Sequence, residues 1–184
     1  MPVSEAEKSA LILVFDGVEE VEALAPVDIL RRTGVVVTIA SLGENKTVHG
    51  RNGISFLADK SFEEVKTESY DLFILPGGPG VLELVDDANL HGYIRDRLKA
   101  NQLCSAICAA PAVFAAAGAL DGKTATSHAS VRDRLPQASD DKVVQDGVII
   151  TSQGAGTAVE FSLKLTEILA GKDQAAEVAA SIHA

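Results

Sequence analysis

The sequence has only two cysteines, Cys104 and Cys108, among its 184 residues. Two cysteines are too few for a disulfide framework, so a compartment that keeps thiols reduced is expected. Long hydrophobic runs are also missing, because the apolar run from Ala10 to Phe15 ends after six residues. A secretory signal core needs about 7–15 apolar residues and a membrane span about 20. We therefore expect a cytoplasmic protein with no membrane association.

Basic residues are scarce as well: 16 lysines and arginines face 26 acidic residues, for a formal net charge of -10. Such a surface repels phosphate backbones and anionic lipids, so no stable nucleic-acid complex is expected. No repeat, low-complexity stretch or flexible linker divides the chain. The length suits one folding unit, and residues 1–184 are expected to form a single domain.

Short apolar runs alternate with amphipathic stretches along the chain. This alternation predicts βαβ units, and hence an α/β fold whose mostly parallel sheet carries helices on both faces. In the helix expected from Glu20 to Thr33, the residues predicted to face the core are Val21, Leu24, Val27 and Leu30. The expected strands are 10–15, 35–40, 72–75, 103–107, 124–127, 143–144 and 148–151; the expected helices are 20–33, 89–101, 111–117, 156–169 and 172–181; a small hairpin is expected between residues 47 and 57.

Ligands of such sheets bind beyond the carboxyl ends of the strands, so residues that directly follow strands are the candidates for a site. Cys108 follows the strand 103–107, and Pro111 stands in the first turn of the next expected helix. This is the strand–turn–helix context of a nucleophile elbow, where the helix N-terminus is expected to lower the thiol pKa. A buried core thiol is the alternative, and it is favoured for Cys104, which lies inside the strand.

Gly77 and Gly78 follow the strand 72–75 and let the backbone approach a ligand closely. Beside an elbow cysteine, the N–H groups of Gly78 and Ala109 predict an oxyanion hole. A simple tight turn is the competing interpretation of this glycine pair.

Three further side chains follow strands or adjoin the site. Glu22 lies next to the expected apolar face of its helix, so it is a candidate for a buried carboxyl with a raised pKa that exchanges a proton with the thiol. Glu19 and Glu20 are explained by the helix dipole alone. His128 follows the strand 124–127 and is a candidate proton shuttle. No cysteine or histidine spacing matches a zinc site, and we expect neither a metal nor an organic cofactor.

Segments throughout the chain match one known family in order. They are Gly17-Val-Glu-Glu-Val-Glu22, Pro26-Val-Asp28, Arg31-Arg32-x-Gly34, Leu75-Pro-Gly-Gly78, Ala106-Ile-Cys-Ala109 with Pro111, His128, and Thr151-Ser152-x-Gly154 with Gly156-Thr157. On these segments the sequence resembles the ThiJ/PfpI superfamily, and within it the DJ-one branch of deglycases and chaperones.

The resemblance implies a flavodoxin-like sandwich that forms a homodimer, with a Cys108 that oxidises readily to a sulfinate. It further implies that Glu22 is the acidic partner of the cysteine and that His128 is the active-site histidine. Gly77, Gly78 and Ala109 fall on the family's oxyanion and substrate-binding positions. Arg51 corresponds to an arginine near the dimer interface.

The activity implied by the resemblance is the glutathione-independent conversion of methylglyoxal or glyoxal to lactate or glycolate. The α-oxoaldehyde is expected to add to Cys108 as a hemithioacetal, either free or as an early adduct on proteins or nucleotides, with slow turnover. The alternative is a redox-sensing chaperone of oxidative stress that acts through oxidation of Cys108.

The sequence departs from the family pattern at two positions: Ala110 stands where a glycine is usual, and Gln153 stands where an arginine is usual. Related peptidases carry a histidine directly after the cysteine, where this chain has Ala109. The chain therefore lacks the residues of a hydrolytic cysteine–histidine–glutamate triad, and peptidase activity is disfavoured.

Overall fold

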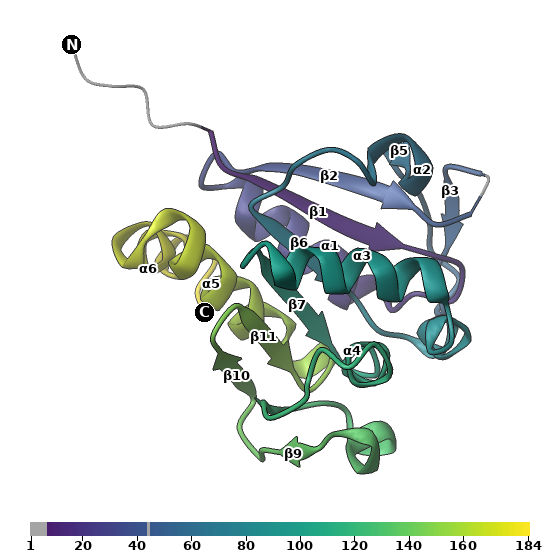
Figure 1. The fold of residues 1–184 in the computed structure, drawn as a ribbon. Helices are drawn as coiled ribbons and strands as arrows, with labels where there is room; N and C mark the ends of the chain where they lie inside the picture. Colours follow the sequence, from purple (N-terminus) through teal and green to yellow (C-terminus); the bar gives the residue numbers. More distant parts are fainter. Residues whose placement is uncertain (1–6, 44) are drawn as a thin grey trace.

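The computed structural model describes residues 7–43 and 45–184. Its centre is a seven-stranded sheet in the order β10-β11-β7-β6-β1-β2-β5 (Figure 1). Neighbouring strands are parallel except for the antiparallel pair β10 and β11, so the predicted mostly parallel sheet is confirmed. The bounds are β1 Ser9–Val14, β2 Val36–Ser41, β5 Lys60–Ser61, β6 Leu72–Leu75, β7 Leu103–Ile107, β10 Val143–Asp146 and β11 Ile149–Ser152.

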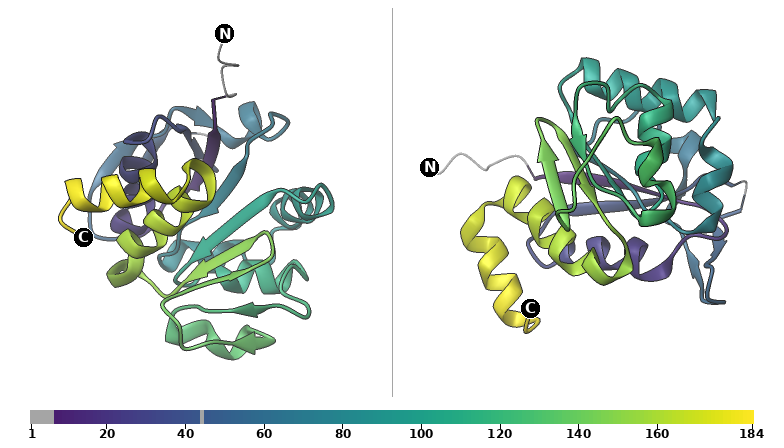
Figure 2. Two further views of the ribbon diagram at one scale, coloured as in Figure 1. Left: turned by 90° about the vertical axis from the view of Figure 1, so that its left-hand side faces the viewer. Right: turned by 90° about the horizontal axis from the view of Figure 1, so that it is seen from below.

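Helices cover both faces of this sheet, as the flavodoxin-like prediction requires (Figure 2). Helices α1 and α5 pack together on one face, with α6 against α5, while α3 and α4 cover the other face. The bounds are α1 Glu20–Arg31, α2 Phe62–Val65, α3 Ala88–Lys99, α4 Pro111–Ala116, α5 Ala158–Ala170 and α6 Lys172–Ser181. None of the helices in the described ranges is long and apolar enough to cross a membrane.

The central strands form the core because their sequences are apolar without interruption. Residues 10–14 of β1 and all of β6 are buried, since helices shield the sheet on both sides. Phe73, Phe114 and Phe161 are the largest fully buried side chains. This rigid centre holds the loops at the carboxyl ends of β1, β6, β7 and β11.

The face that α1 buries differs from the prediction in its first turns. Val27 and Leu30 are buried as predicted, but Val21 is 50% exposed and Leu24 is 36% exposed, whereas Glu22 is only 1% exposed. The first turn of α1 projects beyond the ends of the strands, so its inward face meets the polar backbone of the loops after β6 and β11. A carboxyl therefore points inward where the sequence pattern predicted an apolar stripe.

The strand predicted at 124–127 is shorter and lies outside the main sheet. Only Thr124–Ala125 (β8) is extended and paired, and its partner is β9, Gln137–Ala138, in a separate two-stranded sheet. Residues 129–134 then form a short 3₁₀ helix, η2. His128 thus stands at the start of η2, in an excursion between α4 and β10.

The hairpin predicted between residues 47 and 57 is confirmed as β3, Thr47–His49, paired antiparallel with β4, Ser55–Leu57. Its turn packs on the loop between β1 and α1. There the Gly17 N–H donates to His49 O at 2.8 Å, and the Arg51 N–H donates to Val18 O at 2.9 Å.

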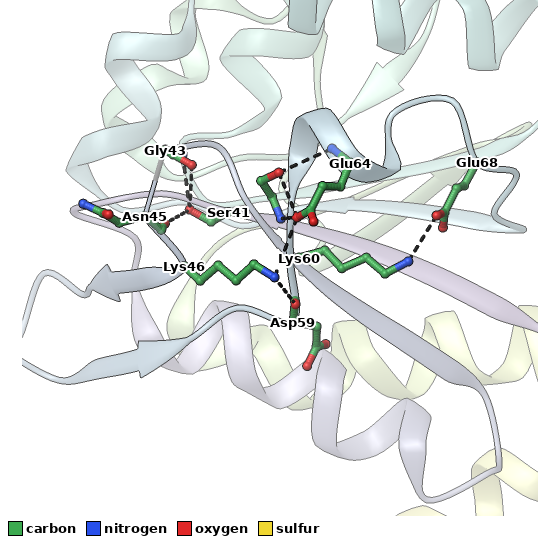
Figure 3. A network of polar contacts seen from close by, with 9 residues as sticks. Ser41, Gly43, Asn45, Lys46, Asp59, Lys60, Glu64 and Glu68 are labelled. Atoms are coloured by element: carbon green, nitrogen blue, oxygen red, sulfur yellow. Dashed lines mark hydrogen bonds and ion pairs between the residues drawn. The ribbon is translucent and has the colours of Figure 1, made fainter.

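The short elements β5 and α2 were not predicted. Ser61 and Glu64 form a reciprocal capping box at the start of α2, and the nearby Lys46 Nζ donates to Asp59 O at 3.0 Å (Figure 3). The Ser-x-x-Glu spacing of a capping box is visible in the sequence. A helix of four residues has no hydrophobic period, however, so the pattern alone gives little signal.

Candidate active site

Cys108 occupies the tight turn between β7 and α4. Its backbone φ is +66°, a conformation that non-glycine residues rarely adopt outside strained functional turns. The turn is held because the Cys108 N–H donates to Ser152 O at 3.0 Å, and Pro111 begins α4 directly afterwards. The half-buried thiol therefore sits at the apex of the predicted nucleophile elbow.

Two backbone N–H groups are directed at the Cys108 sulfur, those of Gly78 and Ala109. Gly78 precedes the 3₁₀ helix η1, Pro79–Leu84, and has a φ of +101°. A Cβ at this position would lie 2.5 Å from Glu19 N, so only glycine fits. The two donors that the sequence predicted as an oxyanion hole thus converge on the thiol.

Gly77 serves the site differently from the predicted oxyanion role. Its N–H donates to Glu22 Oε2 at 2.9 Å, so it is directed at the carboxyl group. A Cβ at Gly77 would lie 2.6 Å from the Cys108 Cβ and 2.7 Å from Glu22 Oε2. The absent side chain is what allows the thiol and the carboxyl to approach each other.

Glu22 is buried against the site and accepts hydrogen bonds from the Cys108 thiol and from the N–H groups of Gly77 and Ala155. Burial raises its pKa from 4.5 to about 7, the hydrogen bond from Cys108 opposes the rise, and the charge of Glu19 adds to it. Glu19 lies close because its carboxylate caps α1, accepting the Glu22 N–H at 2.8 Å. The burial predicted for Glu22 is confirmed, and the direction of its pKa shift is the one expected for a buried carboxyl.

The predicted lowering of the Cys108 pKa is wrong. Burial and the neighbouring Glu22 carboxylate raise the pKa of the thiol from 9.0 to about 12, and the N–H groups of Gly78 and Ala109 offset only part of this. The sequence indicated a helix N-terminus but did not show how completely the carboxyl and the core exclude water. Since Glu22 titrates near pH 7, the thiol and the carboxyl together hold one proton from neutral pH up to strongly alkaline pH.

His128 lies at the exposed rim of the site. Its backbone N–H donates to Cys108 O at 2.8 Å, which ties the start of η2 to the elbow. A Cβ at Gly154 would lie 3.7 Å from Glu22 Oε1 and 3.8 Å from His128 Cδ2. Glu22 and the histidine ring therefore border the same small space beside Gly154.

The loop after β11 contributes residues that were not assigned a role from the sequence. The Ala155 N–H binds Glu22, and the lack of a side chain at Gly154 leaves room between Glu22 and His128. The loop is held by Thr157, whose Oγ1 accepts the Gly154 N–H at 3.1 Å and lies 2.7 Å from Ser152 Oγ. The position of this loop after a strand could have identified it from the sequence, because the loops that carry Cys108 and Gly78 also follow strands.

The departures from the family pattern leave the elbow intact. Ala110 has a φ of -61°, so a glycine is not required there. The Gln153 side chain donates to Asp140 O at 2.9 Å. Arg51 is exposed on the hairpin turn, and no hydrogen bond of the described residues joins its guanidinium to Cys108, Glu22 or His128.

A metal site and a surface cavity are the alternatives to the elbow as a place for a ligand. Within residues 7–43 and 45–184, no group of three or more histidine, cysteine, aspartate and glutamate side chains is arranged to hold a metal ion. A cavity of about 800 Å³ opens near the ends of β1 and β2, lined in part by Asp16, Lys46 and His49. The lining of this cavity does not include Cys108, Glu22 or His128.

Comparison with known proteins gives consistent matches. Residues 8–168 match the DJ-1/PfpI family. Protein dj-1beta of Drosophila melanogaster is 40% identical over 177 residues, covering 94% of this chain and 95% of its own, and its crystal structure superposes with a TM-score of 0.91. The glutathione-independent glyoxalase DJR-1.2 of Caenorhabditis elegans is 35% identical over 174 residues, covering 92% of each chain. Oxidised DJ-1 of Toxoplasma gondii is 34% identical, with a TM-score of 0.91 and coverage of 95% and 97%.

Proposed function

The chain belongs to the DJ-1/PfpI family, and from this premise we propose that it is a glutathione-independent glyoxalase and deglycase. The proposed substrates are methylglyoxal and glyoxal, free or as early adducts on amino groups of proteins or nucleotides, and the products are lactate and glycolate. One observation carries the proposal: the Cys108 thiol donates a hydrogen bond to the buried Glu22 carboxyl, and two N–H donors are directed at the sulfur.

The first step is addition of the Cys108 sulfur to the aldehyde carbon, which forms a C–S bond and an oxyanion. The Cys108 thiol donates its hydrogen bond to Glu22, so its proton passes to the Glu22 carboxylate as the sulfur attacks. The N–H groups of Gly78 and Ala109 lie at the sulfur, within reach of an oxygen on the carbon bound to it. Glu22 then returns the proton to that oxygen, which yields the hemithioacetal and restores the Glu22 carboxylate.

The second step moves a hydrogen within the substrate. Glu22 and His128 border the space beside Gly154, so they are the side chains placed to act on this transfer. Loss of the C1 proton gives an enediolate, and protonation at C2 gives the thioester of lactate. The aldehyde carbon is oxidised while the ketone carbon is reduced, so no external oxidant or reductant is needed. Water then cleaves the thioester and restores the thiol.

The test is lactate formation from methylglyoxal without glutathione. We expect Cys108→Ser to abolish it and Glu22→Gln to lower kcat at least about 100-fold, because each removes half of the proton-sharing pair. Cys104→Ala is the matched control, since this second free thiol is buried in β7 away from the elbow and should leave turnover intact. Full lactate production by Cys108→Ser would refute the proposed function.

We propose a homodimer as the working assembly. Its support is a set of exposed apolar side chains on α1 and on the β3–β4 hairpin: Val21, Leu24, Ile54 and Leu57. Exposed apolar groups gathered on neighbouring elements are typical of an interface. Arg51 lies on the same hairpin turn and would be held at that interface. Because Cys108 must stay reduced, the proposal places the protein in the cytoplasm.

A redox-sensing chaperone is the second candidate. Two equivalents of peroxide would convert the Cys108 thiol to a sulfinate and release two waters, and the N–H groups of Gly78 and Ala109 could hydrogen-bond the new oxygens. The relative from Toxoplasma gondii described as oxidised adds support. Mass spectrometry after mild peroxide, beside the aldehyde assay, separates the candidates: selective sulfinate formation without any turnover would favour the sensor.

A further inference from the structure

The two ring nitrogens of His128 have different surroundings. Nδ1 lies 3.2 Å from the backbone N–H of Ser130, which donates to it, and 2.8 Å from the Ser130 Oγ. The histidine side chain thereby caps the start of η2. A backbone N–H can only donate, so Nδ1 must offer its lone pair. In the neutral ring the proton therefore resides on Nε2.

The proton-bearing edge of the ring faces the site. Cδ2, the bonded neighbour of Nε2, is the ring atom that lies 3.8 Å from the position of a Cβ at Gly154, and Glu22 Oε1 lies 3.7 Å from the same position. The Ser130 contacts hold the opposite edge, and the hydrogen bond from His128 N to Cys108 O fixes the backbone.

We propose that Ser130 is a positioning residue that keeps the His128 proton on Nε2, so that His128 donates a hydrogen bond to the carbonyl oxygen of the bound α-oxoaldehyde. This inference rests on the proposed glyoxalase function and assigns different roles in its proton transfers to Glu22 and His128. An Nε2 that already carries a proton cannot accept another one from the substrate. The C1 proton therefore goes to the Glu22 carboxylate, and the histidine stabilises the oxygen charge of the enediolate.

The position of the proton is measured by NMR of the free protein labelled with ¹⁵N in histidine, with His128→Gln used to assign the signals. We expect wild-type protein to show a protonated Nε2 and an unprotonated Nδ1. Ser130→Thr keeps the hydroxyl donor and should keep this spectrum. Ser130→Asp places an acceptor beside Nδ1 and should draw the proton to that nitrogen.

Ser55→Ala is the matched control, because His49 Nδ1 makes the same 2.8 Å contact with Ser55 Oγ on the hairpin. It should alter the His49 signals and leave those of His128 unchanged. Ser130 is exposed, so its variants should remain folded.

Activity supplies the second measurement. We expect Ser130→Asp to lower kcat for methylglyoxal at least about tenfold and Ser130→Thr to retain it. A wild-type spectrum with the proton on Nδ1 would overturn the inference, as would an Asp variant whose proton has moved without loss of kcat or one whose proton has not moved. Lactate formation that survives Cys108→Ser would instead overturn the proposed function together with the catalytic role of His128. The spectra would still decide which ring nitrogen of His128 carries the proton.

Discussion

At the residue scale, the Cys108 thiol and the Glu22 carboxyl behave as one acid with two ionisations. Burial disfavours charge on either group, and a charge on one disfavours a charge on the other. The first ionisation falls near pH 7, where the pair is able both to release and to accept a proton. This matches the requirement for a group that transfers protons at physiological pH.

The raised pKa of Glu22 predicts a pH-dependent stability. Between pH 4.5 and about 7 the folded protein retains the Glu22 proton that the unfolded chain releases, so the free energy of unfolding falls as the pH rises through this window. At about 1.4 kcal/mol per pKa unit the loss amounts to about 3 kcal/mol. Glu22→Gln does not titrate, so relative to wild type it should gain stability from pH 4.5 to pH 8.

Urea unfolding at several pH values measures this difference. Glu63→Gln, which changes an exposed carboxylate of α2, is the control and should follow wild type across the range. A constant difference between Glu22→Gln and wild type at every pH would contradict the raised pKa.

At the element scale, the β3–β4 hairpin is held to the start of α1 by one buried carboxylate. Glu20 accepts the Asn52 N–H at 2.8 Å, the Asn52 side-chain amide at 2.8 Å and the Ile54 N–H at 3.4 Å. Gly50 packs directly on this carboxyl, since the nearest atoms to a Cβ there all belong to Glu20. Glu20 thus positions the hairpin turn on the helix that also carries Glu22, a role that the helix dipole alone does not describe.

This packing predicts a coupled pair of substitutions. Gly50→Ala should cost about 1–3 kcal/mol in wild type, because its methyl group overlaps the Glu20 carboxyl. In a Glu20→Ala background the obstacle is gone, so the same substitution should be nearly neutral. Gly53→Ala is the control: its φ is +81° with no atom near its Cβ, so its cost should be the same in both backgrounds. Chemical denaturation of the four combinations measures the coupling, and additive effects of Gly50→Ala and Glu20→Ala would contradict it.

At the scale of the whole molecule, the exposed apolar residues of α1 and the hairpin determine the proposed assembly. Ile54 is 54% exposed and Leu57 is 70% exposed. Ile54→Glu should convert the proposed dimer to a monomer, because it places a charge in a desolvated interface. Sedimentation velocity measures the change. Leu82→Glu, on η1 next to α4, is the control and should sediment like wild type. An Ile54→Glu protein that sediments like a wild-type dimer would exclude this surface.

The amino-acid pattern by itself determined the architecture and the centre of the site. Continuous apolar runs form strands that are buried on both faces, and the alternation of these runs with helices requires a mostly parallel sheet. The carboxyl ends of parallel strands meet at one edge, so the sequence predicts that Cys108, Gly78 and Ala109 lie together. The start of α4 was equally readable from local sequence, since Pro111 occupies its first position.

Only the tertiary structure decided the pKa values of Cys108 and Glu22 and which side chains of α1 point toward the site. The sign of the Cys108 pKa shift depends on burial and on a carboxylate from another element, and neither quantity is encoded in the residues around the cysteine. The inward turn of Glu22, the outward turn of Val21 and the Gly77 N–H bound to Glu22 depend equally on where α1 begins relative to the loops. Hydrophobic periodicity describes a helix against a flat apolar surface, and at the edge of the sheet that surface is replaced by polar loop backbone.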